Sequence, residues 1–342
     1  MNGVNTIITP KGATTMNTKK KVAIIFTGGT ISMTVNKDTN AATPSLSSTD
    51  IMSLVKHIRD FVEVQLIDFS AIPGPHMTPQ KMMELKILVQ EQCEQSDISG
   101  VVITHGTDNL EETAYLLELT LQTSKPVVVT GSMRNASELG YDGPSNLASA
   151  ILTAIDDKTH NRGVLVVLND EINAAREVTK THTMSLDTFK SLEFGPLGIV
   201  DSNHVIYYRN QTFAPLHIST NTIESDVALI KIASGMDARM FEFLVAQNVR
   251  GIVIEAMGRG NVPPSVMPGI KKAVHANIPV VLVSRNPLGR TMPSYGYEGG
   301  GLSLKDAGVI MANNLNGQKA RIALMLALAV TDDIETIREF FA

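Results

Sequence analysis

Residues 22–30 read Val22-Ala23-Ile24-Ile25-Phe26-Thr27-Gly28-Gly29-Thr30, an apolar run that ends in a glycine turn. An uninterrupted run of mostly β-branched and aromatic residues predicts a strand that is buried on both faces. Two glycines directly after it allow a tight turn with positive φ and let a ligand approach the backbone closely. The stretch therefore predicts a buried strand with a candidate binding turn at its carboxyl end.

Similar apolar runs alternate with segments of helical period along the rest of the chain. In the first part, the predicted strands are Val22–Phe26, Val62–Phe69, Val101–Thr104, Pro126–Thr130 and Val164–Leu168, with helices near 49–59, 78–95, 109–121 and 145–156. In the second part they are Val227–Ile232, Gly251–Glu255 and Pro279–Val283, with helices near 237–246, 264–276 and 316–329. Buried strands separated by helices are typical of a parallel sheet covered on both faces.

A polar segment without helical period, residues 201–225, separates the two sets and is predicted to be a linker. We therefore expect a two-domain α/β protein, which suits a length of 342 residues. Residues 1–20 are expected to form a disordered leader without a secretory signal. Residues 21–200 form the larger domain, a mostly parallel sheet flanked by helices, and residues 226–342 a smaller α/β domain.

Composition narrows the class of partner. The net charge is −5, the aromatic share is 5% and Trp is absent, so we expect no nucleic-acid surface. No run approaches the roughly 18 apolar residues that span a bilayer, so we expect no membrane insertion. The lone Cys93 excludes an internal disulfide and fits a reducing compartment. A cytoplasmic protein that acts on a small molecule is the expectation.

The sequence lacks the motifs of several common catalytic systems. The eight histidines lack metal-ligand spacing, so no metal is expected. The glycine turn matches neither a dinucleotide fingerprint nor a phosphate-binding loop, so no cofactor is expected. A Gly-x-Ser-x-Gly nucleophile elbow is also missing.

A second turn, His105-Gly106-Thr107-Asp108, follows the strand Val101–Thr104 and opens a helix. Because parallel strands place their carboxyl ends at one edge of a sheet, both threonine turns are expected there. Structural interpretations stay open: Asp108 with Glu111 resembles a helix cap, and His105 is typical of a packed histidine. Glu111 and Glu112 point apart on a helix and are expected to be solvated.

Lys180 follows the strand Val164–Leu168 and would ordinarily be a surface charge. A threonine hydroxyl is a poor nucleophile until a base accepts its proton. A lysine that is desolvated, or held in a relay with Thr107 and Asp108, is able to provide that base. Lys180 is therefore a candidate catalytic residue if the fold brings it to Thr107.

Two motifs, Thr27-Gly28-Gly29-Thr30-Ile31 and the segment from His105 to Tyr115, are specific when they occur together. With them the chain resembles the bacterial-type L-asparaginase/glutaminase family. The resemblance continues through 125–147, 176–180 and 188–198, and in the second domain through 258–261 and 318–321. Nearly the whole chain after residue 20 is covered in matching order.

The resemblance implies roles for specific residues. Thr30 would be the nucleophile that attacks the side-chain amide carbon, and Thr107, Lys180 and Asp108 would form a relay. Asp108 would also pair with the substrate's α-ammonium group. Backbone N–H groups near Gly29, Thr107 and Ser132 would bind the substrate carboxylate or the oxyanion. Dimers or tetramers are implied, with each site completed by a neighbouring C-terminal domain.

Three departures from the family pattern concern the surroundings of these residues. The chain has no tyrosine between Ile31 and Leu46, where the family has a mobile one. The family's Ser-Gln pair for the substrate carboxylate aligns with Gly74 and Pro75, and Ser70 or His76 is a candidate replacement. The neighbour's acidic residue falls near 295–298, so we predict that Tyr295 or Tyr297 of a partner subunit closes the site.

The predicted function is therefore hydrolysis of L-asparagine to L-aspartate and ammonia. The alternatives are a related amidase for L-glutamine or D-asparagine, a non-catalytic amide-binding protein on the same scaffold, and a subunit of a tRNA-dependent amidotransferase. Asparagine and glutamine differ by one methylene, which is worth only about 1–3 kcal/mol of discrimination. The sequence thus predicts the reaction type more firmly than the substrate.

Overall fold

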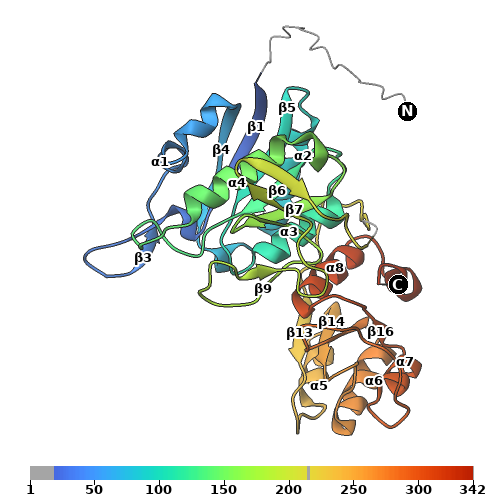
Figure 1. Cartoon of the computed structure of the whole chain (residues 1–342). Helices are drawn as coiled ribbons and strands as arrows, with labels where there is room; N and C mark the ends of the chain where they lie inside the picture. The colour runs from blue at the N-terminus through green and yellow to red at the C-terminus, as the bar shows by residue number, and fades with distance from the viewer. Residues whose placement is uncertain (1–18, 214–215, 342) are drawn as a thin grey trace, which may run out of the picture.

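The computed structural model describes residues 19–213 and 216–341, which form two α/β domains (Figure 1). Of the predicted leader, residues 1–20, positions 1–18 lie outside the described residues. Its last residue, Lys20, is the first residue of strand β1. Figure 1 shows the smaller C-terminal domain below the N-terminal one, with helix α8 at the junction. The predicted two-domain α/β class is confirmed.

The N-terminal domain is built on an eight-stranded sheet in the order β12-β11-β8-β7-β6-β5-β1-β4. Its members are β1 (Lys20–Gly28), β4 (Val62–Ile72), β5 (Ile98–Thr104), β6 (Val127–Thr130), β7 (Val164–Leu168), β8 (Glu171–Ala174), β11 (Gly198–Asp201) and β12 (His204–Tyr207). The strands from β4 to β7 run parallel, and β8, β11 and β12 are antiparallel additions. All five predicted strands of this domain are present.

Helices cover both faces of this sheet. On one face lie α1 (Ser48–Ser53) and α4 (Gly143–Ile155), and on the other α2 (Pro79–Glu94) and α3 (Leu110–Thr120). Short 3-10 helices occur at η1 (Thr30–Ser32), η2 (Lys56–Asp60), η3 (Gly74–His76) and η4 (Asp157–Thr159). Two hairpins lie outside the sheet: β2 (Met33–Val35) with β3 (Ala42–Pro44), and β9 (Thr179–Lys180) with β10 (Phe189–Lys190).

The segment predicted as a linker, 201–225, contains a strand. Residues 204–207 form β12, which pairs with β11 at the edge of the N-terminal sheet. An edge strand has one solvated side, so its exposed and buried residues alternate, and the sequence shows only isolated β-type residues there. The crossing to the second domain therefore follows Tyr207.

The C-terminal domain has a parallel four-stranded sheet in the order β13-β14-β15-β16. Its elements are β13 (Val227–Lys231), α5 (Arg239–Ala246), β14 (Gly251–Ala256), η5 (Pro264–Val266), α6 (Met267–His275), β15 (Val280–Ser284), α7 (Gly301–Asp306), β16 (Ile310–Met311), α8 (Gly317–Leu328) and α9 (Ile334–Glu339). Helix α8 packs between this sheet and α2 and α3, in an apolar core that both domains share. Nowhere in residues 19–213 and 216–341 does a helix meet the length and apolarity of a membrane span.

Candidate active site

The turns after neighbouring strands meet at one edge of the sheet through glycine backbones. A Cβ atom at Gly29 would lie 2.5 Å from Cα of Gly106, and one at Gly106 would lie 2.6 Å from Cα of Gly74. Both separations are shorter than real side chains tolerate, so only glycine allows this contact. The backbone contact between Gly29 and Gly106 places the two threonine turns side by side.

Thr30 is the first residue of η1, directly after two glycines in left-handed conformations. The φ angles of Gly28 and Gly29 are 105° and 81°. Ser32 closes the turn, since its N–H and its hydroxyl both donate to the carbonyl of Gly29, at 3.0 and 2.9 Å. Thr30 itself is half-buried. Its hydroxyl thus lies on a rigid turn that a small molecule is able to reach.

Thr107, Asp108 and Lys180 come together although they are distant in sequence. The Nζ atom of Lys180 donates to Oγ1 of Thr107 at 3.0 Å and to Oδ1 of Asp108 at 2.8 Å. Thr107 is 6% exposed, whereas the Asp108 side chain is 64% exposed. The arrangement links a buried hydroxyl to an accessible carboxylate through one ammonium group.

Asp108 is not the cap of helix α3. The residue that precedes the helix is Asn109, and its side chain makes no capping hydrogen bond. The Asp108 carboxylate is engaged by Lys180 instead. The capping interpretation of Asp108 is therefore wrong, because an ion pair across the turn replaces the local bond.

Glu111 is buried, contrary to the expected solvated helix face. It is 4% exposed, and its carboxylate accepts hydrogen bonds from the hydroxyl of Thr179 and the N–H of Lys180, at 3.1 and 3.4 Å. The C-terminal domain supplies further donors, from Asn316 at 2.9 Å and Gln318 at 3.2 Å. Glu111 therefore connects the backbone of Lys180 to helix α8.

Lys319 reinforces the same connection from α8. Its ammonium group donates to the carbonyls of Arg176, at 3.0 Å, and Val178, and lies 3.8 Å from the Glu111 carboxylate. The side chain is 2% exposed, and burial lowers the pKa of Lys319 to about 8. Both carbonyls belong to the turn that leads into β9 (Thr179–Lys180). The C-terminal domain thus fixes that segment within one chain.

The predicted backbone donors differ in availability. The N–H of Gly29 donates to the carbonyl of Ile72 at 2.9 Å, so it is not free for a ligand. The N–H groups of Thr107 and Ser132 find no acceptor among the described residues. Ser132 is buried, and its hydroxyl donates to the carbonyl of Arg134 at 2.8 Å. Gly29 therefore serves the turn geometry instead of donating to a ligand.

The loop around Gly74 reaches the site through its backbone. Gly74 contacts Gly106, while Pro75 and His76 are exposed. Asn109 lies beside Gly74 and donates to the carbonyl of Met77 at 3.2 Å. The Ser70 hydroxyl donates to the carbonyl of Thr27 at 2.8 Å, so it serves to hold β4 to β1. Of the candidate replacements for a carboxylate clamp, Ser70 already has a structural partner.

His105 is a packed histidine. It is 1% exposed, its Nδ1 atom lies 2.8 Å from the carbonyl of Gly106, and its Nε2 atom lies 2.9 Å from the Thr113 hydroxyl. A carbonyl only accepts, so Nδ1 carries the proton and Nε2 accepts from Thr113. Burial lowers the pKa of His105 to about 4. The ring is neutral at pH 7 and stabilises the turn from behind.

Tyr295 and Tyr297 lie on the C-terminal domain, in the segment between β15 and α7. They are 45% and 56% exposed, and their ring centroids are 5.6 Å apart. The two rings form an exposed aromatic pair.

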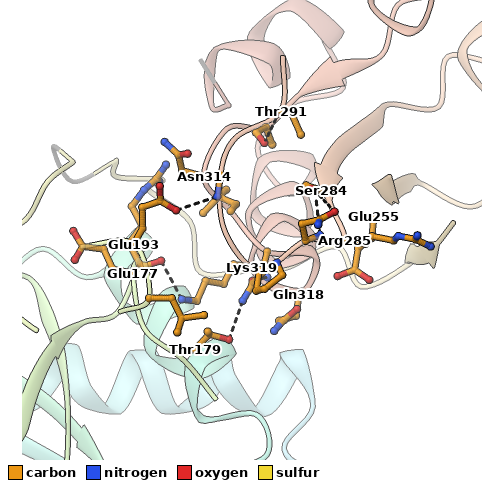
Figure 2. A pocket seen from close by; sticks show the side chains of 18 of the residues that line it. Glu177, Thr179, Glu193, Glu255, Ser284, Arg285, Thr291, Asn314, Gln318 and Lys319 are labelled. Atoms are coloured by element: carbon orange, nitrogen blue, oxygen red, sulfur yellow. Dashed lines mark hydrogen bonds between the residues drawn. The ribbon is translucent and has the colours of Figure 1, made fainter. Parts of the chain in front are cut away.

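A cavity of about 270 Å³ lies behind the Lys180 segment, between the two domains (Figure 2). Thr179 and Glu177 line it from one domain, and Gln318, Lys319 and Glu255 from the other. It does not include Thr30 or Thr107. Among the residues that the structure describes, no cluster of three His, Cys, Asp or Glu side chains is placed to hold a metal ion.

Comparison with known proteins agrees with the two-domain fold. The family described as "Asparaginase, N-terminal" matches residues 21–213, and "Glutaminase/Asparaginase C-terminal domain" matches residues 226–341. The chain belongs to the asparaginase family. This asparaginase-family chain is 37% identical over 331 residues to a "Probable L-asparaginase" of Deinococcus radiodurans, covering 94% of the chain and 97% of that protein.

Two further relatives span most of the chain. An "L-asparaginase" of Bacillus licheniformis is 34% identical over 310 residues, which covers 91% of this chain and 96% of that protein. The crystal structure of a "Probable Cytoplasmic L-asparaginase" from Campylobacter jejuni superposes with a TM-score of 0.85 at 32% identity, over 94% of this chain and 99% of that one. The family and its two-domain fold therefore extend over nearly the full length.

Proposed function

We propose that the chain hydrolyses L-asparagine to L-aspartate and ammonia, with Thr30 as the nucleophile. The observation that carries this proposal is the contact of Lys180 with both Thr107 and Asp108, beside the turn that bears Thr30. Two relatives support the same substrate: the Bacillus protein is named "L-asparaginase" and the Deinococcus protein "Probable L-asparaginase".

The reaction runs in two steps. The Thr30 oxygen bonds to the side-chain amide carbon, the carbon–nitrogen bond breaks, and the nitrogen leaves as ammonia after gaining a proton. Water then attacks the acyl-Thr30 ester, which releases aspartate and restores the hydroxyl. A threonine needs a base for its proton, and the relay of Thr107, Lys180 and Asp108 is the proton-handling group of this site.

Substrate binding uses the exposed and unpaired groups at the sheet edge. The Asp108 carboxylate is accessible and pairs with the substrate's α-ammonium group. The free N–H groups of Thr107 and Ser132 bind the substrate carboxylate or the oxyanion. Gly74 and Pro75 border the same space, with a backbone instead of polar side chains toward the ligand.

The proposed assembly is a dimer or tetramer in the cytoplasm. One of the two exposed tyrosines, Tyr295 or Tyr297 of the partner subunit, closes the site, since large exposed aromatic side chains are typical of interfaces. The single buried cysteine and the relative named cytoplasmic support the location. Changing both tyrosines to Phe should slow turnover in an intact oligomer, and light scattering should report the oligomer.

The test is ammonia release from L-asparagine, L-glutamine and D-asparagine. We expect activity with L-asparagine, and losses of at least about 10³-fold in Thr30→Ala and about 10²-fold in Thr107→Ala. Thr39→Ala changes an exposed threonine between β2 and β3, in the hairpin that follows η1; it is the matched control and should keep full activity. Binding of asparagine without turnover in the wild type would instead establish a binding protein, and full activity in both variants would remove the assigned roles.

A further inference from the structure

Tyr141 contacts the nucleophile turn from another part of the chain. It lies in the loop between β6 and α4, and its hydroxyl donates to the carbonyl of Ile31 at 2.6 Å, across 110 residues of sequence. Ile31 follows Thr30 directly. A phenolic hydroxyl therefore lies one residue from the proposed nucleophile.

The carbonyls of the turn show why this contact matters. Gly29 accepts from Ser32, Thr30 accepts from Met33, and Ser32 accepts from the N–H groups of Ser45 and Leu46. All these donors belong to the same segment, 29–46. Among the donors found in the described chain, Tyr141 is the one that ties a carbonyl of η1 to a different loop. Within residues 19–213 and 216–341, no other hydrogen bond joins η1 to the loop after β6.

The loop that carries Tyr141 is itself fixed. The Asp142 carboxylate accepts from the N–H groups of Met133 and Arg134, at 3.0 and 2.9 Å, and from the Asn146 amide at 2.9 Å. These bonds hold the loop to the start of α4 and keep it beside Ser132.

The ring of Tyr141 lies over a glycine at the start of α4. A Cβ atom at Gly143 would lie 2.5 Å from Cζ of Tyr141, so a larger residue there would displace the ring. The position of the hydroxyl therefore depends on Gly143 as well as on Tyr141.

The same loop reaches the hairpin that follows Thr30. The N–H of Ala136 donates to the carbonyl of Met33, and the N–H of Val35 donates to the Ser137 hydroxyl, each at 3.0 Å. These bonds hold β2, whereas the Tyr141 bond holds η1 itself. Removing the Tyr141 hydroxyl would thus loosen η1 while the hairpin stays attached.

We propose that Tyr141 is a positioning residue that holds Thr30 at a fixed distance from the loop of Ser132 and from the turn of Thr107. The inference rests on the proposed role of Thr30. Burial and the neighbouring Asp142 carboxylate raise the pKa of the Tyr141 phenol, so the hydroxyl remains a donor across the working pH range. A displacement of about 1 Å at a reacting group is able to cost about 10²-fold in rate.

The test compares Tyr141→Phe with Tyr207→Phe, since Tyr207 also uses a partly buried hydroxyl, toward Thr159 at 2.7 Å, on β12. We expect kcat for L-asparagine to fall about tenfold to a hundredfold in Tyr141→Phe, with KM changed less than about threefold. The control should keep its kcat. Gly143→Ala, which keeps the phenol but displaces the ring, should reproduce the loss. In Tyr141→Phe and in Gly143→Ala, the backbone amides of residues 30–35 should exchange hydrogen faster than in the wild type.

The outcomes separate this inference from the proposed function. If Tyr141→Phe and Gly143→Ala keep the wild-type kcat while Thr30→Ala is inactive, the positioning role is refuted and the nucleophile stands. If Thr30→Ala keeps full activity, the proposed function is refuted, and the positioning role of Tyr141 is refuted with it because it depends on Thr30. A fall in kcat accompanied by an equal loss in Tyr207→Phe would mean general destabilisation and would also overturn the role of Tyr141.

Discussion

The Nζ atom of Lys180 lies 3.0 Å from Oγ1 of Thr107, although 73 residues separate the two side chains. The pair forms because β9 pairs with β10 and directs Lys180 toward the turn after β5. A second bond, to Asp108 at 2.8 Å, balances the charge of the ammonium group. The hydroxyl of Thr107 thus depends on Lys180 for its partner.

Lys180→Met should reduce kcat for L-asparagine by about 10²-fold or more, because the relay loses the group that joins Thr107 to Asp108. The melting temperature should change little, since the Asp108 carboxylate that loses its partner is 64% exposed and stays solvated. Lys190→Met is the matched control: Lys190 lies on the paired strand and contacts Glu171 at 2.7 Å. Ammonia release and thermal melting check both variants, and equal activity in the two would contradict a special role for Lys180.

Asp108→Asn should affect substrates that carry an α-ammonium group more than those without one. Asp108 is the exposed carboxylate of the site, so its charge is available to a ligand. We expect kcat/KM to fall further for L-asparagine than for succinamate, which lacks the amino group, by about tenfold or more. An equal fall for both amides would assign Asp108 to the relay alone.

The sequence predicted the parallel core of the fold because short, uninterrupted apolar runs between helices are typical of strands buried in a parallel sheet. The strands Val22–Phe26 and Val164–Leu168 lie inside β1 and β7. The antiparallel additions β8, β11 and β12 were missed because these four-residue strands contain polar residues and so lack an uninterrupted apolar run. The hairpin β2–β3 was missed for the same reason.

The sequence also placed the threonine turns correctly at one sheet edge, through the rule for parallel strands. It could not show that Glu111 is buried, because the local rule treats adjacent glutamates as solvated. A signal was present, since Leu110 and Leu119 lie on opposite faces of helix α3, and apolar residues on more than one face indicate a buried helix. Tyr141 gave no signal at all, because its partner Ile31 lies 110 residues away.

Lys319→Met should destabilise the protein and slow the enzyme together. It leaves the carbonyls of Arg176 and Val178 without their donor and removes the cation beside Glu111. Loss of one member of a buried ionic group costs about 3–5 kcal/mol. Urea unfolding should show that loss, and kcat should fall because the segment before Lys180 is freed. Lys271→Met, an exposed lysine on α6, is the control and should lie within about 0.5 kcal/mol of the wild type.

Gly106→Ala should push the Gly74 loop away from the turn that bears Thr107. Its Cβ atom would lie 2.6 Å from Cα of Gly74, a backbone atom that is unable to rotate away. We expect a loss of about 1–3 kcal/mol in the free energy of unfolding and a marked fall in kcat. At Gly296 the nearest atom to a Cβ is a Leu302 methyl carbon at 3.9 Å, so Gly296→Ala is the control for stability. Equal unfolding free energies in the two variants would contradict the close contact of Gly106 with Gly74.

His105 should make the protein sensitive to acid. In the unfolded chain a histidine has a pKa near 6.5, whereas burial lowers the pKa of His105 to about 4 in the fold. Between these values the unfolded chain binds a proton that the folded chain does not, so stability falls as the pH drops from about 6.5 toward 4. The loss reaches about 3 kcal/mol at most.

Urea unfolding at pH 7, 5.5 and 4.5 should show this slope in the wild type and in His204→Gln, an exposed control. His105→Gln, whose amide is able to keep both partners, Gly106 and Thr113, should show a flatter slope, and an unchanged slope would mean that other groups cause the acid sensitivity.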